Sequence, residues 1–461
     1  MADYALRLTS EQHEVLRSHL MPTDGNEAVA LALCGRRSGD DRHIFVARKI
    51  VPVPYAGCSV RTPDRVTWPT EAVEPLVREA FGRGQAIIKF HSHRADYRQF
   101  SSTDDHSDET LFTSISSLLG DGLPHASVIM LPDGSYVGRA VKDGLEFEPL
   151  ATITVIGDDI INGTETSYLL RQEAASTRNQ QVFGKGTIAQ LRTMSAAVVG
   201  CSGTGSLVVE QLARLGIGKL VLVDPDFVEE KNLNRILNTG KEDAYLRKPK
   251  VFALASAIAR MGLGQEVLPL PMNLITRKAV TEVAGCDVLF GCTDGAEARH
   301  VLNRLATFYS MPYFDVGVRL DADGLGGISN ISGTVHYLRP GGSSLLSREV
   351  YVMEQVEAEE LRRTNPEMYR ARRDEGYLRG IQEDRPAVIN VNMFFASLAV
   401  HEFLSRLHPF RNAPNSSYAI VRGNLLEPFR VTEPDGEPCA RLQRHIGRGD
   451  VEPLLDRPDL S

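Results

Sequence analysis

The sequence predicts an α/β protein of two units: a smaller α/β unit at the N-terminus, then a Rossmann-like unit with a mainly parallel sheet. Its 461 residues exceed the ~250–300 at which a single hydrophobic core stops growing. An apolar run, a glycine-rich turn, an amphipathic helix and a second apolar run follow one another over residues 196–223, the order of a βαβ unit. A separate series of strands and helices occupies residues 1–150. We expect connecting helices over 151–190, the Rossmann-like unit over 191–450 and a tail over 451–461.

The composition is that of an ordinary globular protein, with 42% hydrophobic and 24% charged residues. The net charge of −8 argues against nucleic acid as the main partner. No apolar run approaches the ~18 residues that a membrane span needs, and the N-terminus lacks the pattern of a signal peptide. The six cysteines are scattered without a CxxC pair, which is typical of reduced thiols. We therefore expect a cytoplasmic protein with no membrane partner.

The N-terminal unit ends in a pattern typical of a metal site. We expect a helix over 10–20, strands within 26–35, 42–51 and 86–90, and a helix over 71–81. The last strand continues into His91 and His93, and a loop then supplies Ser101 and Asp104, a spacing of H-x-H-x7-S-x-x-D. Because alternate residues of an extended chain point to one side, both histidines can face one metal ion, with Asp104 as the third ligand.

Three ligands leave an open fourth position, as in catalytic zinc sites, where a bound water has its pKa lowered to about 7. Glu27 is the upstream candidate for the general base, and the Ser101 hydroxyl is a candidate donor to an oxyanion. Two alternatives stay open: a His-x-His pair is often only an exposed strand edge, and Asp105 or His106 are rival ligands.

This spacing, with the upstream glutamate, resembles the JAB/MPN (JAMM) zinc isopeptidases, which cleave after the C-terminus of ubiquitin-like proteins. The resemblance implies that His91, His93 and Asp104 hold zinc. It also implies that Glu27 is the general base and that Ser101 stabilises the oxyanion. Arg94 departs from the family, which commonly has proline after the second histidine.

In the Rossmann-like unit, a predicted strand (196–199) ends at a glycine-rich turn, and a helix and a strand (219–223) follow. The N-terminus of that helix is a predicted anion site. The glycine pattern alone also fits an NAD-dependent oxidoreductase. The polar residues beyond it favour a nucleoside triphosphate with Mg²⁺, because they combine carboxylates with fixed cations at strand ends. These residues are Asp224, Asn232, Arg235, Lys250 and Asp294.

The same region resembles the ThiF/MoeB and ubiquitin-activating adenylyltransferases over roughly the last three-fifths of the chain. The matching positions imply an ATP site made of Gly200, Gly203, Gly205, Asp224, Asp226, Asn232, Arg235 and Lys250, and an Mg²⁺ site at Asp294. Ser202 stands where the family usually has another glycine. Asp226 has the alternative role of capping local backbone.

The family resemblance also implies a homodimer in which an arginine near the start of the adenylation unit reaches the partner's nucleotide. Arg178 is the candidate and Arg171 the runner-up, and a surface role for the arginine is the alternative. Predicted helices over 166–174 and 187–193 flank this position. Segment 354–380 is rich in arginine and glutamate, which predicts an exposed helix or a mobile crossing loop. No CxxC pair accompanies it, so the structural zinc of related adenylyltransferases is not expected.

A thioester intermediate would need a nucleophilic thiol near the adenylate. Cys439 is the candidate because arginine and histidine neighbours can lower a thiol pKa, and a cysteine without function is the alternative.

Together the two resemblances imply a bifunctional enzyme. It would adenylate the C-terminal carboxylate of a ubiquitin-like protein with ATP and Mg²⁺, and hydrolyse peptide or isopeptide bonds after that C-terminus with Zn²⁺. Such fusions resemble components of bacterial ubiquitin-like modification operons, some linked to antiphage defence, where a conjugating enzyme is a further expected partner. Activation of a sulfur-carrier protein for cofactor biosynthesis is an alternative. So is a non-catalytic scaffold that binds the modifier.

Overall fold

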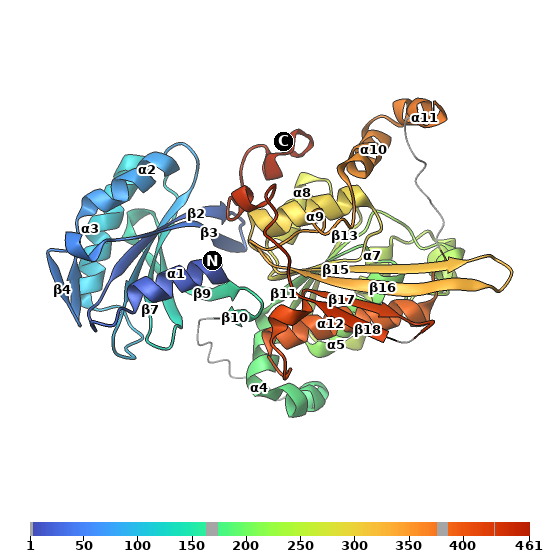
Figure 1. Cartoon of the computed structure of the whole chain (residues 1–461), viewed down its shortest axis with the longest axis horizontal. Helices are drawn as coiled ribbons and strands as arrows, with labels where there is room; N and C mark the ends of the chain where they lie inside the picture. The colour runs from blue at the N-terminus through green and yellow to red at the C-terminus, as the bar shows by residue number, and fades with distance from the viewer. Residues whose placement is uncertain (1–2, 163–173, 376–385, 428) are drawn as a thin grey trace.

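A computed structural model of the chain describes residues 3–162, 174–375, 386–427 and 429–461. Two sheets, each covered by helices, lie side by side in it (Figure 1). Among the described residues, no helix combines the length and the apolar composition needed to cross a membrane.

Residues 3–162 form a closed mixed sheet, which we call the barrel unit. Its strands are β1 (Asp3–Thr9), β2 (Val29–Arg37), β3 (Arg42–Pro52), β6 (Ala86–Ser92), β7 (His125–Met130), β8 (Tyr136–Val141), β9 (Phe147–Ile156) and β10 (Ile160–Asn162). The order β1-β3-β2-β6-β7-β8-β9 closes because β1 pairs with both β3 and β9, and β10 is added beside β9. The boundary expected near residue 150 therefore falls inside β9, and the unit continues to Asn162.

Helices cover both faces of the closed sheet. Helix α1 (Ser10–Leu20) packs on one face through Leu16 and Leu20. Helices α2 (Glu74–Ala80) and α3 (Ser102–Leu119) pack on the other face, beside a small hairpin of β4 (Val60–Thr62) and β5 (Arg65–Thr67). The helix expected over 71–81 is confirmed only in its second half, because residues 70–73 form a 3-10 turn.

Residues 174–461 form the Rossmann-like unit around a second eight-stranded sheet. In spatial order its strands are β13 (Glu266–Leu270), β12 (Lys219–Val223), β11 (Ser195–Val199), β14 (Val288–Gly291), β15 (Tyr313–Ala322), β16 (Ile328–Leu338), β17 (Ile420–Asn424) and β18 (Phe429–Glu433). The pairs from β13 to β15 are parallel and those from β15 to β18 antiparallel. The expected strand–turn–helix–strand unit is confirmed by β11, α5 (Gly203–Leu215) and β12.

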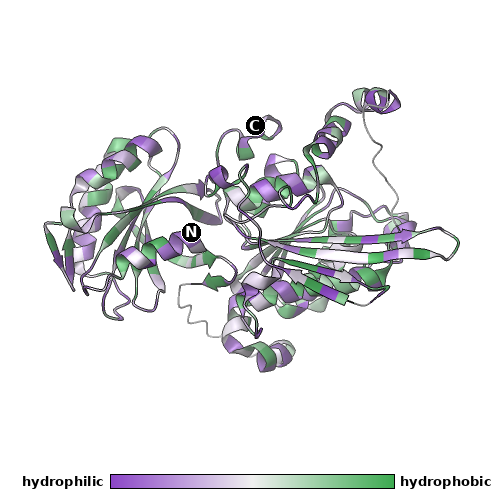
Figure 2. Ribbon diagram, viewed as in Figure 1, coloured by the Kyte–Doolittle hydropathy of each residue, from purple (hydrophilic) through white to green (hydrophobic). Residues whose placement is uncertain are grey.

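The sheet separates two apolar layers. Helices α4 (Thr177–Thr193), α5, α7 (Lys250–Met261) and α12 (Ile389–Leu407) bury one face, and α8 (Arg277–Ala284) with α9 (Ala296–Phe308) buries the other. The long strands and the helices of this unit both carry hydrophilic as well as hydrophobic residues (Figure 2). The short helix α6 (Lys241–Tyr245) precedes α7. The charged segment 354–380 forms helices α10 (Met353–Thr364) and α11 (Pro366–Asp374) as far as it is described.

The barrel unit docks on the amino ends of the parallel strands. The buried Arg7 guanidinium donates to the carbonyls of Cys286 (2.6 Å) and Tyr309 (3.0 Å), and this burial lowers the pKa of Arg7 to about 10. Arg42 pairs at 2.7 Å with Asp287, the residue immediately before β14. The carboxyl ends of the parallel strands are therefore left on the side away from the barrel unit.

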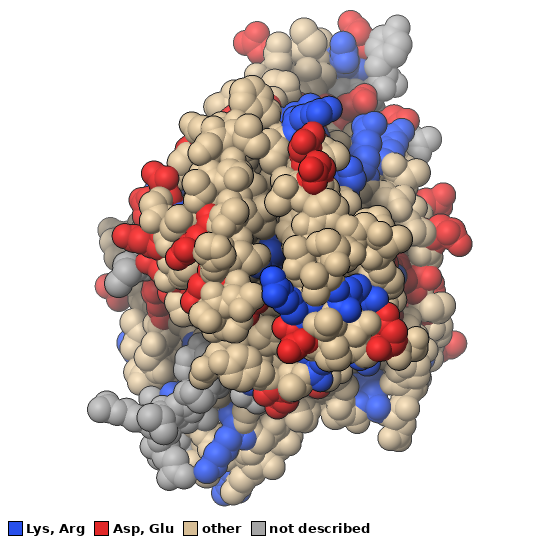
Figure 3. Space-filling view, turned by 90° about the vertical axis from the view of Figure 1, so that its left-hand side faces the viewer, with Lys and Arg blue, Asp and Glu red and all other residues tan. Residues whose placement is uncertain are grey.

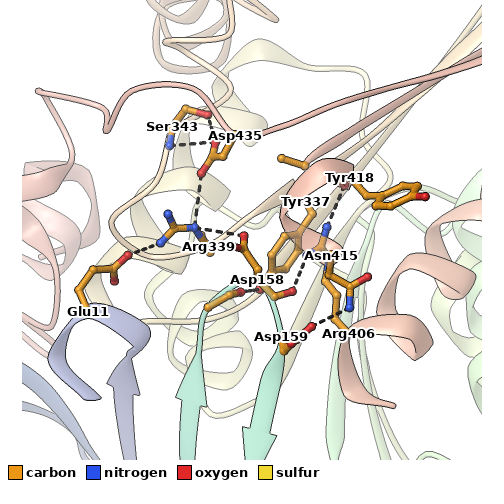
Figure 4. Close-up of polar contacts among 12 residues, drawn as sticks. Glu11, Asp158, Asp159, Tyr337, Arg339, Ser343, Arg406, Asn415, Tyr418 and Asp435 are labelled. Carbon is orange, nitrogen blue, oxygen red and sulfur yellow. Dashed lines mark hydrogen bonds and ion pairs between the residues drawn. The ribbon is translucent and has the colours of Figure 1, made fainter. Parts of the chain in front are cut away.

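A second contact surrounds the turn between β9 and β10 (Figure 4). The Tyr337 hydroxyl donates to the Gly157 carbonyl at 2.6 Å, and the Asn415 amide donates to Asp159 at 2.6 Å. The buried Arg406 donates to the carbonyl of Asp158 at 2.5 Å and lies over the Tyr337 ring. These contacts bury polar groups with partners in both units, so the two units form one continuous structure.

The C-terminal segment also crosses between the units. Gly35 of β2 donates to the Gly447 carbonyl at 3.0 Å, and the Asp450 N–H donates to the Arg36 carbonyl at 2.6 Å. Beyond this crossing, Leu454, Leu455 and Leu460 are buried in the α8/α9 layer. Residues 451–461 therefore pack against the Rossmann-like unit through these three leucines and do not form a separate tail.

Candidate functional site

The three predicted metal ligands converge at the end of β6. The buried His91 and His93 have their Nε2 atoms 3.3 Å apart. The Asp104 carboxylate lies 3.1 Å from His91 Nε2 and 3.6 Å from His93 Nε2. All three ligand atoms lie within 4.8 Å of one another, so one ion can contact all of them.

Asp104 is placed by a helix start and not by the loop that we expected. Ser101 is the N-cap of α3: its hydroxyl accepts from the Asp104 N–H at 3.2 Å, and Asp104 accepts from the Ser101 N–H at 2.7 Å. The S-x-x-D spacing is itself the sequence signature of such a capping box, so the signal was present. The Ser101 hydroxyl also donates to Asp104 at 2.7 Å and must rotate to reach an oxyanion.

The chemistry of the cluster fits zinc. His93 Nδ1 lies 2.8 Å from the Tyr97 carbonyl, so Nδ1 carries the proton and the Nε2 lone pair faces the cluster. Burial favours the neutral, ligating form of His91 by lowering its pKa. Burial raises the pKa of Asp104, but its close contacts with the two imidazoles and with Ser101 outweigh burial and hold that pKa well below its usual range. Two imidazoles and one carboxylate are a common donor set of catalytic zinc.

Glu27 lies at the same end of the barrel unit. It precedes β2, whose Val29 is opposite His91, and its N–H donates to Thr62 of β4 at 2.9 Å. Burial raises the pKa of Glu27 to about 7. The charge of His93 lowers this pKa, and the charge of Asp104 raises it. A carboxyl group with this pKa can accept and release a proton near neutral pH.

The rival ligands have other places. Asp105 pairs with Arg139 at 2.5 Å, and His106 is exposed on α3. The departing Arg94 donates to the Pro22 carbonyl at 3.3 Å. None of these three residues belongs to the cluster formed by the described residues.

The glycine-rich turn forms a tight loop between β11 and α5. Gly200 has φ +88°, and a Cβ on Gly205 would lie 1.8 Å from the Gly200 carbonyl oxygen. A Cβ on Gly203 would lie 2.4 Å from Asn392 Nδ2. The Ser202 side chain does not cap α5, so this thirteen-residue helix presents its N-terminus to the loop as an anion site.

Asp224 and Lys250 follow the neighbouring strand. The buried Asp224 carboxylate accepts from the N–H groups of Cys201 (2.7 Å) and Asp226 (2.9 Å), and burial raises its pKa. It therefore organises the glycine loop directly. Lys250, at the start of α7, pairs with the exposed Asp226 at 2.8 Å and lies 3.9 Å from Asp224. Asp226 thus holds the lysine that was predicted to meet the nucleotide.

The remaining predicted residues of this site lie around the same loop. The Arg235 side chain passes beside the start of α5, because a Cβ placed on Gly203 would lie only 3.2 Å from its Cδ atom. Asn232 accepts from the Glu229 N–H at 3.2 Å and shapes the turn before Arg235. Asp294 is exposed between β14 and α9. The structure therefore brings the predicted nucleotide residues together at the carboxyl ends of β11, β12 and β14, where α/β sheets bind ligands.

An ion pair beside Asp294 was missed from sequence. Arg299 of α9 pairs at 3.1 Å with the fully buried Asp315 of β15, which also accepts from the Tyr313 hydroxyl at 2.9 Å. Burial raises the pKa of Asp315, and the charge of Asp294 acts in the same direction. An aspartate inside the otherwise apolar stretch YFDVGV was the available signal.

Two predicted residues lie away from this loop. Arg178 is exposed at the start of α4, where its neighbour Asn179 donates at 3.0 Å to Arg214, near the C-terminus of α5. It is therefore about 18 Å from the glycine loop along that helix. The buried Cys439 donates its N–H to the Gly342 carbonyl. Gly342 follows the end of β16, which lies beside the start of β15 and so on the side of the sheet where the barrel unit docks. Arg171 and the helix expected over 166–174 lie outside the described residues, except for Ala174.

The metal cluster and the nucleotide loop lie at opposite ends of the molecule. The Arg36 end of β2 contacts the Rossmann-like unit, whereas Val29, opposite His91, lies about 23 Å away along the strand. Figure 3 shows the molecule from the barrel side, where acidic and basic side chains are interspersed.

Comparisons with known proteins concern the Rossmann-like unit. The family model described as ThiF family matches residues 175–433, more than half of the chain. The ubiquitin-like modifier-activating enzyme 5 of Aedes aegypti is 29% identical over 188 residues, 38% of this chain and 45% of that protein. The adenylyltransferase and sulfurtransferase MOCS3 of Bos taurus is 35% identical over 147 residues, 31% of this chain and 32% of that protein. The chain thus spans less than half the length of these curated relatives.

Among solved structures, E. coli MccB with ATP has a TM-score of 0.43 at 17% identity, covering 58% of this chain and 74% of MccB. A likeness at this level carries no argument about function.

Proposed function

Because the chain belongs to the ThiF family, we propose that it adenylates the C-terminal carboxylate of a ubiquitin-like protein with ATP and Mg²⁺. The observation that carries this proposal is the convergence of a glycine loop, a lysine, an arginine and a carboxylate at the carboxyl ends of three parallel strands. This donor set suits a triphosphate, and the family argues against the NAD-dependent alternative.

The residues have distinct tasks in this proposal. The N-terminus of α5 binds phosphate oxygens, and Lys250 exchanges its contact with Asp226 for the triphosphate. Arg235 adds a second cation beside the loop. Mg²⁺, held by Asp294, would neutralise charge on the phosphates. A carboxylate oxygen attacks the α-phosphorus and the bond to pyrophosphate breaks, which gives an acyl-adenylate and pyrophosphate.

The relatives support two classes of protein substrate. One is named as a ubiquitin-like modifier-activating enzyme and the other as an adenylyltransferase and sulfurtransferase. Activation of a sulfur carrier is therefore the second candidate function. It predicts a thiocarboxylate in the presence of a sulfur donor, whereas modifier activation predicts conjugates on lysine when a conjugating enzyme is added.

For the barrel unit we propose hydrolysis of peptide or isopeptide bonds after the C-terminus of the same protein, in the manner of JAB/MPN isopeptidases. The support is the cluster of His91, His93 and Asp104, with Glu27 nearby at a pKa of about 7. Zinc would polarise the scissile carbonyl and activate a water. Glu27 takes a proton from the attacking water as the water oxygen bonds to the carbonyl carbon, and gives that proton to the nitrogen as the carbon–nitrogen bond breaks. Ser101 turns from Asp104 toward the oxyanion.

The opposite placement of the two sites bears on their order. A protein whose C-terminus has been freed at the barrel unit must leave it before the same carboxylate can reach the nucleotide loop. We propose two separate reactions without a passage between them. The position of Arg178 supports a homodimer in which this arginine acts on the partner subunit's nucleotide, because its own loop is out of reach.

The adenylation proposal is tested by ATP–pyrophosphate exchange with a panel of purified ubiquitin-like proteins that end in a free C-terminal carboxylate. Exchange should depend on a member of this panel and fall to background in Asp294→Ala. His91→Ala, altered at the other end of the molecule, is the matched control and should keep the wild-type rate. No exchange with a fully processed substrate would refute adenylation.

The hydrolysis proposal uses the same variants with their roles reversed. The substrate is the ubiquitin-like protein extended by a short C-terminal peptide, and cleavage is followed by mass spectrometry. Zinc-loaded wild type and Asp294→Ala should cleave it, whereas His91→Ala should not. Loss of cleavage in both variants, or retention in both, would rule out this site.

A further inference from the structure

A buried ion-pair network underlies the candidate metal cluster and has no role in the chemistry above. Lys89 of β6 pairs with Asp108 of α3, whose other oxygen receives Arg139 of β8 at 2.7 Å and 3.2 Å. The Lys89 and Asp108 side chains are 3% and 0% exposed, and that of Arg139 is 10% exposed. Three charges held this deep must be matched to one another.

The network joins the two elements that carry the ligands. Lys89 is two residues before His91, so both side chains leave β6 on the same side. Asp108 is four residues after Asp104, one turn further along the same face of α3. The Lys89–Asp108 pair therefore ties the strand that bears a histidine ligand to the helix that bears the carboxylate ligand.

Arg139 extends the tie to the first turn of α3. Besides Asp108 it pairs with Asp105, the neighbour of Asp104, at 2.5 Å. Its guanidinium lies 3.9 Å from the Phe100 ring and 3.9 Å from the Phe147 ring, between the two. Phe100 immediately precedes Ser101. One planar cation thus contacts the residues on both sides of the Ser101–Asp104 turn.

These contacts restrict direction as well as distance. An apolar contact between α3 and the sheet would allow the helix to slide, whereas a forked guanidinium fixes both the angle and the register of its carboxylate partners. Metal ligands must be placed to within roughly 0.2 Å, and groups outside the ligand set commonly provide this accuracy. The network also pairs Asp105 and Asp108, which leaves Asp104 as the carboxylate directed at the histidines.

We propose that Arg139, acting through Asp105, Asp108 and Phe100, is the positioning residue that holds Asp104 and Ser101 against the two histidines. This inference rests on the proposed zinc site. Arg139 does not touch the metal or the substrate. It sets how well a metal fits.

The test compares metal binding by the metal-free full-length wild type, Arg139→Lys and Arg78→Lys. The Arg139 change keeps a positive charge but removes the fork and the ring stacking. The Arg78 change is the same substitution on the exposed face of α2. Co²⁺ is titrated and its visible absorption recorded, because the band positions and intensities report the geometry of the ligands. Thermal unfolding of each metal-free protein and its ATP binding are measured in parallel.

We expect Arg139→Lys to bind Co²⁺ about 10–100-fold more weakly, with altered bands, while its ATP binding stays unchanged. Arg78→Lys should match wild type in every measurement. Wild-type affinity and bands in Arg139→Lys would overturn the inference while leaving the zinc site standing. No Co²⁺ binding by wild type would remove the zinc site and the inference together.

Should Arg139→Lys fail to fold, Phe147→Leu serves in its place. It removes one of the two stacked rings and leaves every ion pair of the network. A smaller loss of Co²⁺ affinity, about two- to five-fold, is expected because the variant keeps the ion pairs of Arg139 and loses only one of its two ring contacts. An unchanged affinity and spectrum would again contradict the proposal.

Discussion

Gly449 offers a direct test of how the two units are joined. It has φ +61°, and a Cβ there would lie 2.3 Å from the carbonyl oxygen and 2.5 Å from the nitrogen of Arg36. These are backbone atoms of β2 and cannot move aside alone. In Gly449→Ala we expect the clash to cost about 1–3 kcal/mol, and separation of the crossing segment from β2 to lose two hydrogen bonds worth about 1 kcal/mol each.

Gly144→Ala is the matched control. Gly144 has φ +75°, and a Cβ there would meet nothing within 4 Å. It carries only the conformational penalty of about 1–2 kcal/mol, partly offset by about 0.4–1 kcal/mol from the stiffer unfolded chain. Separation of the crossing segment relieves the clash, so the cost of the clash and that of the two lost hydrogen bonds are alternatives and do not add. The free energy of unfolding should therefore be lower in Gly449→Ala than in the control by about 1–3 kcal/mol.

The assay is urea unfolding, followed by circular dichroism for the whole chain and by the fluorescence of Trp68, the single tryptophan, for the barrel unit. Gly449→Ala should lower the unfolding midpoints seen by both probes, or make them differ, because the C-terminal crossing segment loses its contact with β2. Equal midpoints in Gly449→Ala and Gly144→Ala would refute the placement of the crossing segment against β2.

Three further predictions concern the two sites and the pH dependence. Gly205→Ala should weaken ATP binding at least about tenfold, because its Cβ would lie 1.8 Å from the Gly200 oxygen and the loop must open; an unchanged dissociation constant would contradict this loop geometry. The Arg178→Ala and Asp294→Ala variants should each be inactive. When their subunits are mixed at equal concentration, about a quarter of the wild-type ATP–pyrophosphate exchange should return if the arginine acts across a two-fold dimer, because half of the dimers are mixed and each has one complete site. No recovery would exclude that role. Burial lowers the pKa of His125 from 6.5 to about 3, so the unfolded chain binds this proton first as the pH falls. The contribution of neutral His125 to the free energy of unfolding is complete above pH 6.5 and is lost toward pH 3 at about 1.4 kcal/mol per pH unit. The free energy of unfolding of His125→Asn should therefore depend less steeply on pH than that of wild type. Equal slopes would refute the lowered pKa of His125.

The local features of both sites could be predicted from sequence because short-range periodicity fixes them. Alternate residues of a strand share a side, and this period of two alone predicts that His91 and His93 lie together. A glycine turn between an apolar strand and an amphipathic helix predicted the loop after β11. The sequence does not separate a loop from a helix start at Ser101, because the S-x-x-D spacing fits both a catalytic site and a capping box.

The sequence by itself therefore determined the α/β class, the nucleotide loop, the candidate ligands and the family of the Rossmann-like unit. Tertiary structure alone decided that β1 closes the barrel by pairing with β9, and that the barrel docks on the amino ends of the parallel strands. It also placed the two sites at opposite ends, Arg178 away from its own loop, and the leucines of residues 451–461 in the core. These features join residues far apart in the chain. No local spacing encodes them, because each is selected by the sum of buried surface and paired polar groups over the whole molecule.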